Sequence, residues 1–436
     1  MTAASPTTRP RQWLILSHAF NVDGRAESVT ITDKLPHLLA AGVRPVVLSG
    51  VMGTRDARFP HQQLLPWGPA GVRFELRHVL ARRWGGRGLR YRAAMLAASL
   101  LLAPFIVLER LLGGLRSQWS WALPATARGL RLIRRGDIDL VYSTGGVFSA
   151  HLAGWWLKRL TGVRWIAEVH DPLLVPGRPV VTRQERFFAR LEGRICRDAD
   201  LAWWFTDGAL AAARHRHPVL DGRGIVVLPG AEPPVVRTAY QRGPRCVLGH
   251  FGSLSATRSF APVLKALADL FARRPEWRAL LRVEVYGAAL DPVAAPLVEA
   301  LGLTDVVQPI GRLEFDPQTG LSGRARVMQR MQQMDVLLML HGTIPDCAEY
   351  IPSKLYEYFW SRRPVLALTH DNAQLDALVL EHGGWVAPAT DPTAIEAAIE
   401  SVVERWCAGP LPDVAAPPVT VGAAVQRILE AVDHHG

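Results

Sequence analysis

Residues 13–49 read WLILSHAFNVDGRAESVTITDKLPHLLAAGVRPVVLS, and this stretch decides the fold class. It opens with a short apolar run at 13–17, which a polar loop follows. Apolar residues then recur at helical spacing over 31–39 until Gly42, and a β-rich run follows at 45–49. Strand, helix and strand in this order form a βαβ unit, which predicts a parallel sheet.

The same alternation continues along most of the chain. Further strand candidates, separated by helical stretches, lie at 139–143, 165–169, 201–205, 225–228, 246–251, 283–286, 306–310, 335–340 and 365–368. Prolines and glycines interrupt any regular element at 229–245, and 436 residues suffice for two domains with separate cores. We therefore expect an α/β protein with two Rossmann-like domains, each built on a parallel sheet.

The net charge of +11 comes almost wholly from arginine. Such a charge suits nucleic acid, an anionic membrane surface or a phosphorylated small molecule. The chain has no basic region with heptads, no Cys/His finger and no aromatic RNA-binding strand motif. We therefore expect no nucleic-acid partner.

The arginines gather around one apolar run, 93–108, which contains Pro104. They are Arg82, Arg83, Arg87, Arg90, Arg92, Arg110 and Arg116. The run falls short of the roughly 20 residues of a spanning helix, so it is expected to lie in an anionic membrane interface. Trp119 and Trp121 would then lie at the headgroup level. A buried core helix with solvated arginines fits the run equally well.

Residues 1–10 are expected to be disordered, and they lack the apolar core of a secretory signal. The four cysteines lie far apart without metal-ligand or redox spacing: Cys196, Cys246, Cys347 and Cys407. This favours reduced thiols, with no disulfide and no zinc. We expect a cytoplasmic protein at the inner face of the cell membrane.

The strongest local signal is EYIPSKLYEY at 349–358, between two strand candidates. Proline suits the first turn of a helix, so a helix is expected to start at about Pro352. The backbone amides of Ser353 and Lys354 would then face a ligand, and helix N-termini bind phosphate through such groups. Lys354 would add a full positive charge.

Two glutamates flank this expected phosphate site. Glu357 lies about one turn along the helix, where it can accept hydrogen bonds from a pair of hydroxyl groups. Glu349 precedes the helix and would contact another part of the same ligand. Two chance glutamates at an ordinary exposed helix start are the alternative interpretation.

The Glu-x7-Glu motif with its internal Pro-Ser-Lys resembles the retaining glycosyltransferases of the family 4-like group, which have the GT-B fold. In that fold two Rossmann-like domains face each other across a cleft. The resemblance implies that Glu357 binds the donor ribose, that Ser353 and Lys354 hold the diphosphate, and that Glu349 contacts the transferred sugar. It continues at 363–367 and 382–386.

A weaker resemblance covers 249–258, the expected first strand and loop of the donor domain, which includes Gly252. The family places an arginine on the diphosphate there, and Arg258 fits that role. The family's nearby lysine is missing, since no lysine comes before Lys265. Arg258 as a plain surface charge is the alternative.

In the N-terminal half, AEVHDP at 167–172 resembles the segment whose histidine approaches the transferred sugar, which assigns His170 to the site; a hydrogen-bonded loop histidine is the alternative. The loop at 21–25 resembles the family's first glycine-containing loop, although it has one glycine where many members have more. Gly24 and Arg25 are expected to contact phosphate or acceptor. The stretch 143–146 is either a nest of amides or a tight turn.

We expect an acceptor domain at 11–235 and a donor domain at 245–410. The resemblance does not explain residues 58–124, which we expect to form a basic apolar membrane-facing insert of the acceptor domain. A tail helix at 411–436 could pack back on the acceptor domain. Glu349, His170 and Lys354 are the expected catalytic residues, and a nucleotide-diphosphate sugar is the expected co-substrate. No Asp-x-Asp motif follows a strand, so no metal and no other cofactor is expected.

The expected activity is sugar transfer with retention to a lipid-linked or saccharide acceptor in polysaccharide or glycoconjugate biosynthesis. The alternatives are a non-hydrolysing nucleotide-sugar epimerase and a non-catalytic sugar-nucleotide-binding membrane scaffold.

Overall fold

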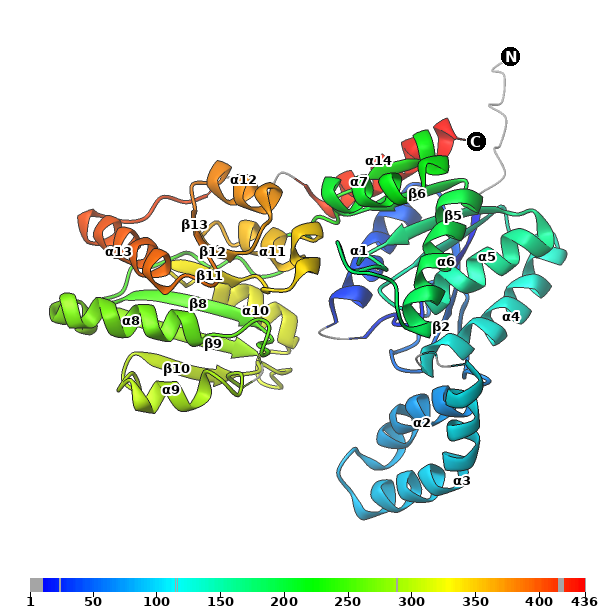
Figure 1. The fold of residues 1–436 in the computed structure, drawn as a ribbon, viewed down its shortest axis with the longest axis horizontal. Helices are drawn as coiled ribbons and strands as arrows, with labels where there is room; N and C mark the ends of the chain where they lie inside the picture. Colours follow the sequence, from blue (N-terminus) through cyan, green and yellow to red (C-terminus); the bar gives the residue numbers. More distant parts are fainter. Residues whose placement is uncertain are drawn as a thin grey trace. The chain divides into compact units, whose positions relative to one another are not determined.

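The computed structural model describes residues 11–22, 25–113, 115, 117–287, 289–414 and 419–435 (Figure 1). The chain divides into two compact units. Unit 1 comprises residues 1–228 together with 421–436, and unit 2 comprises residues 229–420. The chain therefore leaves unit 1, builds unit 2 and returns to unit 1 with its last helix.

Unit 1 contains a seven-stranded sheet in the order β3-β2-β1-β4-β5-β6-β7, and all its described strand pairs are parallel. Its strands are β1 (Gln12–Leu16), β2 (Arg44–Ser49), β3 (His61–Gln63), β4 (Leu140–Thr144), β5 (Arg164–Val169), β6 (Leu201–Trp204) and β7 (Gly224–Val226). The central strands are buried on both faces, which explains their nearly continuous apolar sequences.

The helices of unit 1 are α1 (Ala26–Ala40), α2 (Pro69–Trp84), α3 (Leu89–Gly113), α4 (Ala122–Arg134), α5 (Ser149–Thr161), α6 (Arg183–Asp198), α7 (Asp207–Arg216) and α14 (Val421–His434), with short 3-10 turns η1 (Ser117–Trp121) and η2 (Pro218–Arg223). Side chains of α4, α5, α6 and α7 join the strands in one core cluster. Helix α14 packs beside α1. The guanidinium of Arg164 donates to the carbonyl of Val432, and Arg11 pairs with Asp433 at 2.9 Å.

The insert of unit 1 is a hairpin of α2 and α3 that extends away from the sheet (Figure 1). The apolar run at 93–108 underestimates the length of the helix that contains it. Helix α3 covers 25 residues and continues through Pro104. No residue of α3 is buried, so the core-helix alternative is wrong for this structure. The placement of Trp121 at a headgroup level is also wrong, because its side chain is fully buried in the core of unit 1.

Unit 2 contains a six-stranded sheet in the order β10-β9-β8-β11-β12-β13, again with parallel pairs. Its strands are β8 (Cys246–Gly252), β9 (Leu281–Gly287), β10 (Val307–Gly311), β11 (Val336–Leu340), β12 (Val365–Thr369) and β13 (Trp385–Pro388). Its helices are α8 (Ala261–Arg273), α9 (Ala295–Ala300), α10 (Gly323–Met331), α11 (Lys354–Trp360), α12 (Ala373–Glu381) and α13 (Pro392–Ala408), with 3-10 turns η3 (Pro275–Ala279) and η4 (Pro345–Glu349).

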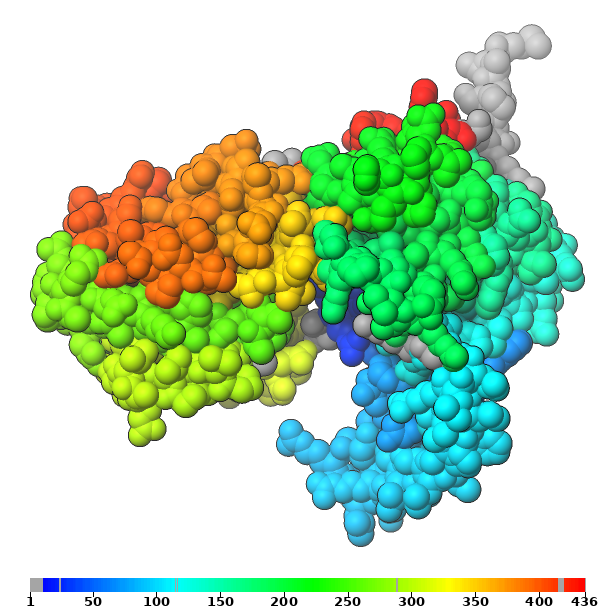
Figure 2. Space-filling view, viewed as in Figure 1, coloured from blue at the N-terminus to red at the C-terminus, as the bar shows by residue number. Residues whose placement is uncertain are grey.

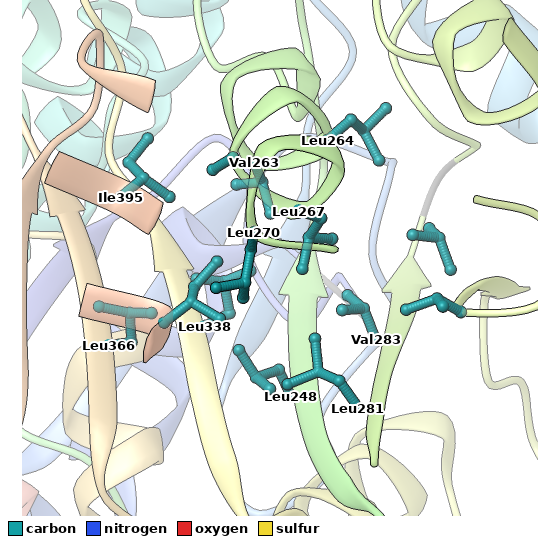
Figure 3. Packing of buried hydrophobic residues seen from close by; sticks show 14 of the residues in the cluster. Leu248, Val263, Leu264, Leu267, Leu270, Leu281, Val283, Leu338, Leu366 and Ile395 are labelled. Atoms are coloured by element: carbon teal, nitrogen blue, oxygen red, sulfur yellow. The ribbon is translucent and has the colours of Figure 1, made fainter. Parts of the chain in front are cut away.

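The core of unit 2 lies between α8, α13 and one face of this sheet (Figure 3). Leu264 and Leu267 of α8 are fully buried, as is Leu248 of β8. The apolar positions of α8 follow helical spacing, which gives it a continuous face toward the strands. This packing fixes β8 and β11 side by side, and their carboxyl ends carry the residues described next.

Candidate functional site

Unit 2 changes strand order between β8 and β11. The chain proceeds from β8 outward to β9 and β10, and then returns to β11 on the other side of β8. Ligands of open parallel sheets bind beyond the carboxyl ends of strands at such a switch point. The loops after β8 and β11 both start there: Gly252 ends β8, Arg258 follows it, and Glu349 and Ser353 lie between β11 and α11, which starts at Lys354.

The two loops are joined by hydrogen bonds. The amide of Thr343, after β11, donates to the carbonyl of Thr257, after β8, at 2.8 Å. One residue on, the Arg258 guanidinium donates to the Tyr350 hydroxyl at 2.7 Å. The Tyr350 carbonyl in turn accepts from the Asn372 side chain at 2.8 Å. Arg258 is therefore held beside the motif segment by specific contacts.

Helix α11 starts later than expected. It begins at Lys354 with Ser353 as its N-cap, so the predicted start at Pro352 is two residues early. The amides of Leu355 and Tyr356 donate to the carbonyls of Pro352 and Ser353. The amides of Ser353 and Lys354 lie ahead of this first hydrogen-bonded turn.

The two motif glutamates differ in their surroundings. Glu349 ends the 3-10 turn η4 and is buried. Glu357 lies on α11, with its carboxylate 3.2 Å from a guanidinium nitrogen of Arg324 and 3.8 Å from the Lys354 ammonium. Arg324 belongs to α10, so a third element contributes a cation to this edge.

Two buried histidines lie at the same strand ends. Burial lowers the pKa of His250 to about 4, and the charges of Lys354 and Arg258 act in the same direction. Burial likewise lowers the pKa of His341 to about 4, with Arg258 and His370 adding to the effect. Both imidazoles are therefore neutral at physiological pH, and the positive charge at this edge belongs to the arginines and Lys354.

The tautomer of His250 follows from its contacts. Its Nδ1 lies 3.0 Å from the Leu338 carbonyl, which can only accept, so Nδ1 carries the proton. The acceptor Nε2 is buried without a hydrogen-bond partner among the described residues. A Cβ atom at Gly252 would lie 3.6 Å from it, which places Gly252 next to this nitrogen.

Sequence reasoning missed His250, His341, Tyr350 and Arg324 as members of this cluster. His250 and His341 carried a usable signal, because each lies at the carboxyl end of a central strand. Arg324 had none, because its pairing with Glu357 depends on how α10 packs.

Unit 1 has its own switch point, between β1 and β4. His170 follows β5, and its Nε2 lies 3.1 Å from the Thr144 hydroxyl and 3.4 Å from Glu168. Its ring contacts Phe205, with ring centres 4.9 Å apart. These contacts hold the His170 imidazole in a fixed orientation at the carboxyl end of β5.

Glu168 is a fully buried carboxylate with several donors around it. They are Lys34 of α1, Tyr142, Thr144 and Trp203. Burial alone would raise the pKa of Glu168, but the charge of Lys34 and the contacts of His170 and Lys34 outweigh it and lower the pKa. Glu168 is therefore ionised, and its carboxylate lies 3.4 Å from Nε2 of His170.

The other predicted residues of unit 1 are less closely grouped. Gly24 lies outside the described residues. Arg25 is exposed and pairs with Glu27 at 3.2 Å. A Cβ atom at Gly146 would lie 3.1 Å from an Asp171 carboxylate oxygen and 3.2 Å from one of Glu27. The turn at 143–146 therefore faces acidic groups.

The hairpin is connected to this edge of unit 1. Glu75 of α2 is fully buried; its carboxylate accepts from the Val51 amide at 3.1 Å and lies 3.1 Å from His18 Nε2. Arg82, in the last turn of α2, donates to the carbonyls of Val51 and Gly53. Both contacts fix the loop that follows β2.

That loop packs directly on the loop after β1. A Cβ atom at Gly53 would lie 1.8 Å from the Phe20 carbonyl oxygen, so only glycine fits there. The amide of Thr54 donates to the carbonyl of Asn21 at 3.1 Å. The hairpin, the loop after β2 and the described residues 20–22 after β1 thus form one contiguous structure.

The sequence matches no protein-family model and no curated protein. Solved structures match over nearly the whole chain. A UDP-forming α,α-trehalose-phosphate synthase from Burkholderia vietnamiensis is 13% identical with a TM-score of 0.58, over 98% of this chain and 96% of that one. A mutant of S. aureus TarM in complex with fondaparinux, α-GlcNAc-glycerol and UDP is 8% identical with a TM-score of 0.58, over 97% and 96%.

The fold is GT-B. A putative UDP-N-acetylglucosamine 2-epimerase from Listeria monocytogenes also matches, at 12% identity and a TM-score of 0.55, over 98% of this chain and 97% of that one. The prediction of two Rossmann-like domains with parallel sheets is therefore confirmed. At these identities the GT-B matches establish the fold alone, and the roles of the individual site residues stay predictions.

Proposed function

We propose that this chain is a retaining glycosyltransferase of the family 4-like group that uses a nucleotide-diphosphate sugar. The observation that carries the proposal is that Arg258 donates to the Tyr350 hydroxyl, four residues before Lys354, and that the charges of both cations act on the buried His250. Two fixed cations beside buried neutral imidazoles suit a diphosphate leaving group, because charge develops on it in the transition state. In the proposal no metal is needed for this stabilisation.

The carboxylates of unit 2 would orient the rest of the donor. Glu357, between Arg324 and Lys354, can accept hydrogen bonds from the ribose hydroxyls. Glu349, held in the turn ahead of α11, would contact the transferred sugar. Retention would follow if the acceptor proton passes to the leaving phosphate on the donor's own face.

In unit 1, His170 would contact the transferred sugar. Its orientation is set by Glu168, Thr144 and Phe205, so the imidazole presents a fixed edge. Preorganisation of this kind lowers the cost of positioning groups during reaction.

We further propose that the acceptor is lipid-linked and that the protein binds the inner face of an anionic cell membrane, as a cytoplasmic enzyme of polysaccharide or glycoconjugate biosynthesis. Among the described residues, α3 is the helix with the length and hydropathy to cross a bilayer, and its side chains are strongly exposed, including Leu101 at 72% and Leu112 at 76%. An exposed apolar surface along a helix of 25 residues marks an interaction site.

The hairpin geometry favours a helix that lies in the interface. Glu109, near the end of α3, accepts from the Ala70 amide at the start of α2 at 2.9 Å, so both open ends of the hairpin stay at unit 1. Crossing would carry the arginine-rich turn around 82–92 through the hydrocarbon, at roughly 3 kcal/mol for each arginine. Lying flat keeps these arginines among the headgroups.

The contacts of Glu75 and Arg82 connect this membrane surface to the β1 and β2 loops. An acceptor that is anchored in the bilayer would therefore reach the carboxyl edge of unit 1 beside the hairpin. This is the support for a lipid-linked acceptor over a free saccharide.

A labelled-donor experiment tests the proposal. Purified protein would be screened by thermal shift against nucleoside-diphosphate sugars, and the stabilising donor would then be incubated with membrane lipid extract. Label in the lipid phase supports the proposal. A free epimer would instead support an epimerase, which the similarity to the Listeria structure makes the second candidate. Donor binding without turnover would indicate a scaffold.

A further inference from the structure

A second charged surface, separate from the hairpin, runs along α6. Its arginines follow one another at spacings of three and four residues, which places them on one side of the helix. We call this set the arginine ladder: Arg183, Arg186, Arg190, Arg194 and Arg197. Over 14 residues the ladder extends about 21 Å.

The ladder has few counter-charges. Arg197 pairs with Asp198 at 3.2 Å, and no other ladder residue has an ion pair within the described part of the chain. The acidic residues of α6 are engaged elsewhere: Glu185 closes the capping box with Thr182, and Glu192 pairs with Arg216 at 2.7 Å. Most of the positive charge of this face is therefore uncompensated by the protein.

The middle of the ladder is organised rather than loosely solvated. Arg194 stacks on the Trp155 ring, with 3.9 Å between its guanidinium carbon and the ring centre. Burial, followed by the neighbouring charges of Arg190 and Arg197, lowers the pKa of Arg194. Like charges held this close repel one another, and an anion placed between them relieves that repulsion.

A groove of about 310 Å³ lies on this face. Three ladder residues line it, Arg190, Arg194 and Arg197, together with His217. Gly193 and Val219 also line it, and a Cβ atom at Gly193 would lie 3.2 Å from the His217 ring. The groove is thus basic and open enough for a phosphate group.

The ladder begins where the exposed apolar helix ends. The Arg183 guanidinium donates to the carbonyl of Leu111 in the last turn of α3, at 3.1 Å. Figure 2 shows both segments on the face turned to the viewer, α6 in green and the hairpin in cyan. Val181, two residues before the first ladder arginine, is 65% exposed, which extends the apolar surface toward α6.

We propose that the arginine ladder binds the phosphate headgroups of an anionic lipid leaflet while α3 occupies the adjoining interface. Charge complementarity over about four helical turns, beside an apolar helix whose last turn contacts Arg183, fits this partner. The inference extends the membrane contact proposed above, but it depends on neither sugar transfer nor donor binding. Basic side chains near an anionic surface each add about 1 kcal/mol of attraction.

Vesicle binding by the full chain tests the ladder. The variant is Arg190→Gln/Arg194→Gln/Arg197→Gln, and its matched control is Arg131→Gln/Arg134→Gln/Arg135→Gln, which removes the same charge from exposed sites at the end of α4. On vesicles with phosphatidylglycerol the ladder variant should bind at least about ten-fold more weakly than wild type. The control should bind nearly as wild type, and added salt should weaken wild-type binding.

A variant that keeps the Trp155 contact, Arg190→Gln/Arg197→Gln, with its control Arg131→Gln/Arg134→Gln, replaces the triple variants if Arg194 proves necessary for folding. Equal losses in ladder and control variants would overturn the proposal, because net charge alone would then explain binding. A ladder variant that loses affinity for soluble polyphosphate but binds vesicles normally would overturn the lipid assignment.

The hairpin is tested separately with Leu101→Gln/Phe105→Gln. If this variant loses vesicle binding while the ladder variant keeps it, the ladder proposal is wrong and the hairpin contact stands. Neither result tests the glycosyltransferase proposal, which the labelled-donor experiment tests separately.

Discussion

The two switch points of this molecule have the same topology and different arrangements of charged residues. In unit 2 the carboxyl edge gathers cations, Arg258, Lys354 and Arg324, over buried neutral histidines. In unit 1 the corresponding edge gathers carboxylates, with Glu168 buried below His170 and Asp171 beside Gly146. One scaffold can therefore present an anion site or an acidic site, and the residues at the strand ends decide which.

The difference also concerns how each edge is stabilised. Unit 1 buries an ion pair between Lys34 and Glu168, each almost fully inaccessible to water. Unit 2 buries its histidines uncharged and leaves Lys354 partly exposed. A change of a single residue should therefore affect folding most in unit 1 and ligand binding most in unit 2.

The largest effect is expected from Lys34→Met. It leaves the buried charge of Glu168 without its main partner, which should destabilise unit 1 by about 3–5 kcal/mol. Urea unfolding followed by the fluorescence of buried tryptophans measures the loss. The double variant Lys34→Met/Glu168→Leu should recover much of it, and a double variant as unstable as the single would contradict the ion-pair explanation.

The next effect is the pH dependence of unit 2. The pKa values of His250 and His341 are lowered to about 4, whereas an unfolded histidine titrates near 6.5. Between these values the unfolded chain binds protons that the folded unit excludes, so stability falls as the pH decreases from 6.5 to 4. The expected loss is up to roughly 3 kcal/mol for each histidine.

Thermal unfolding of wild type and His250→Gln/His341→Gln across that pH window measures this contribution. The unit 2 transition of the variant should depend much less on pH. Unit 1 should keep its own dependence, because burial also lowers the pKa of His151 to about 4. An unchanged slope for unit 2 would show that these imidazoles do not control it.

A smaller and more local effect is expected for the cations of unit 2. Lys354→Gln and Arg258→Gln should each weaken donor binding by about 1.5–3 kcal/mol, the range for hydrogen bonds to charged groups. Calorimetric titration with the stabilising nucleotide sugar measures it. Lys265→Gln and Arg278→Gln are the matched controls in the same unit. Comparable losses of donor affinity in these controls would show that the cations at the switch point have no special role in donor binding.

The smallest effect is expected for Arg82→Gln. It removes the guanidinium contacts with the carbonyls of Val51 and Gly53 and should loosen that loop by about 1–2 kcal/mol. Hydrogen exchange of the amides at 51–54 measures the change. Arg83→Gln, one residue along the same helix, should leave these amides unaffected. Equal exchange rates in both variants would show that the Arg82 contacts do not stabilise the loop.

The fold was predictable because alternation is a local property. The βαβ stretch at 13–49 and the strand pattern around 335–368 specify parallel sheets without knowledge of distant contacts. The motif glutamates were found because their spacing places them around one helix start. The start itself was placed two residues early, since proline fits a first turn but does not fix where hydrogen bonding begins.

The missed features all depend on packing between distant segments. Trp121 was assigned to a headgroup layer by residue type, yet the core of unit 1 closes over it. The length of α3 was underestimated because Glu109 and Arg110 ended the apolar run in sequence, although the helix continues through them. Arg324 and Glu357 are 33 residues apart, and only the position of α10 joins them.

The placement of α14 has a consequence for how the molecule is made. Its residues are synthesised after all of unit 2, yet they complete unit 1, whose first strand precedes them by about 400 residues. The surface of α1 that α14 covers must therefore remain exposed while all of unit 2 is produced. Synthesis of α14, and not completion of residues 1–228, is therefore the moment at which unit 1 can be completed.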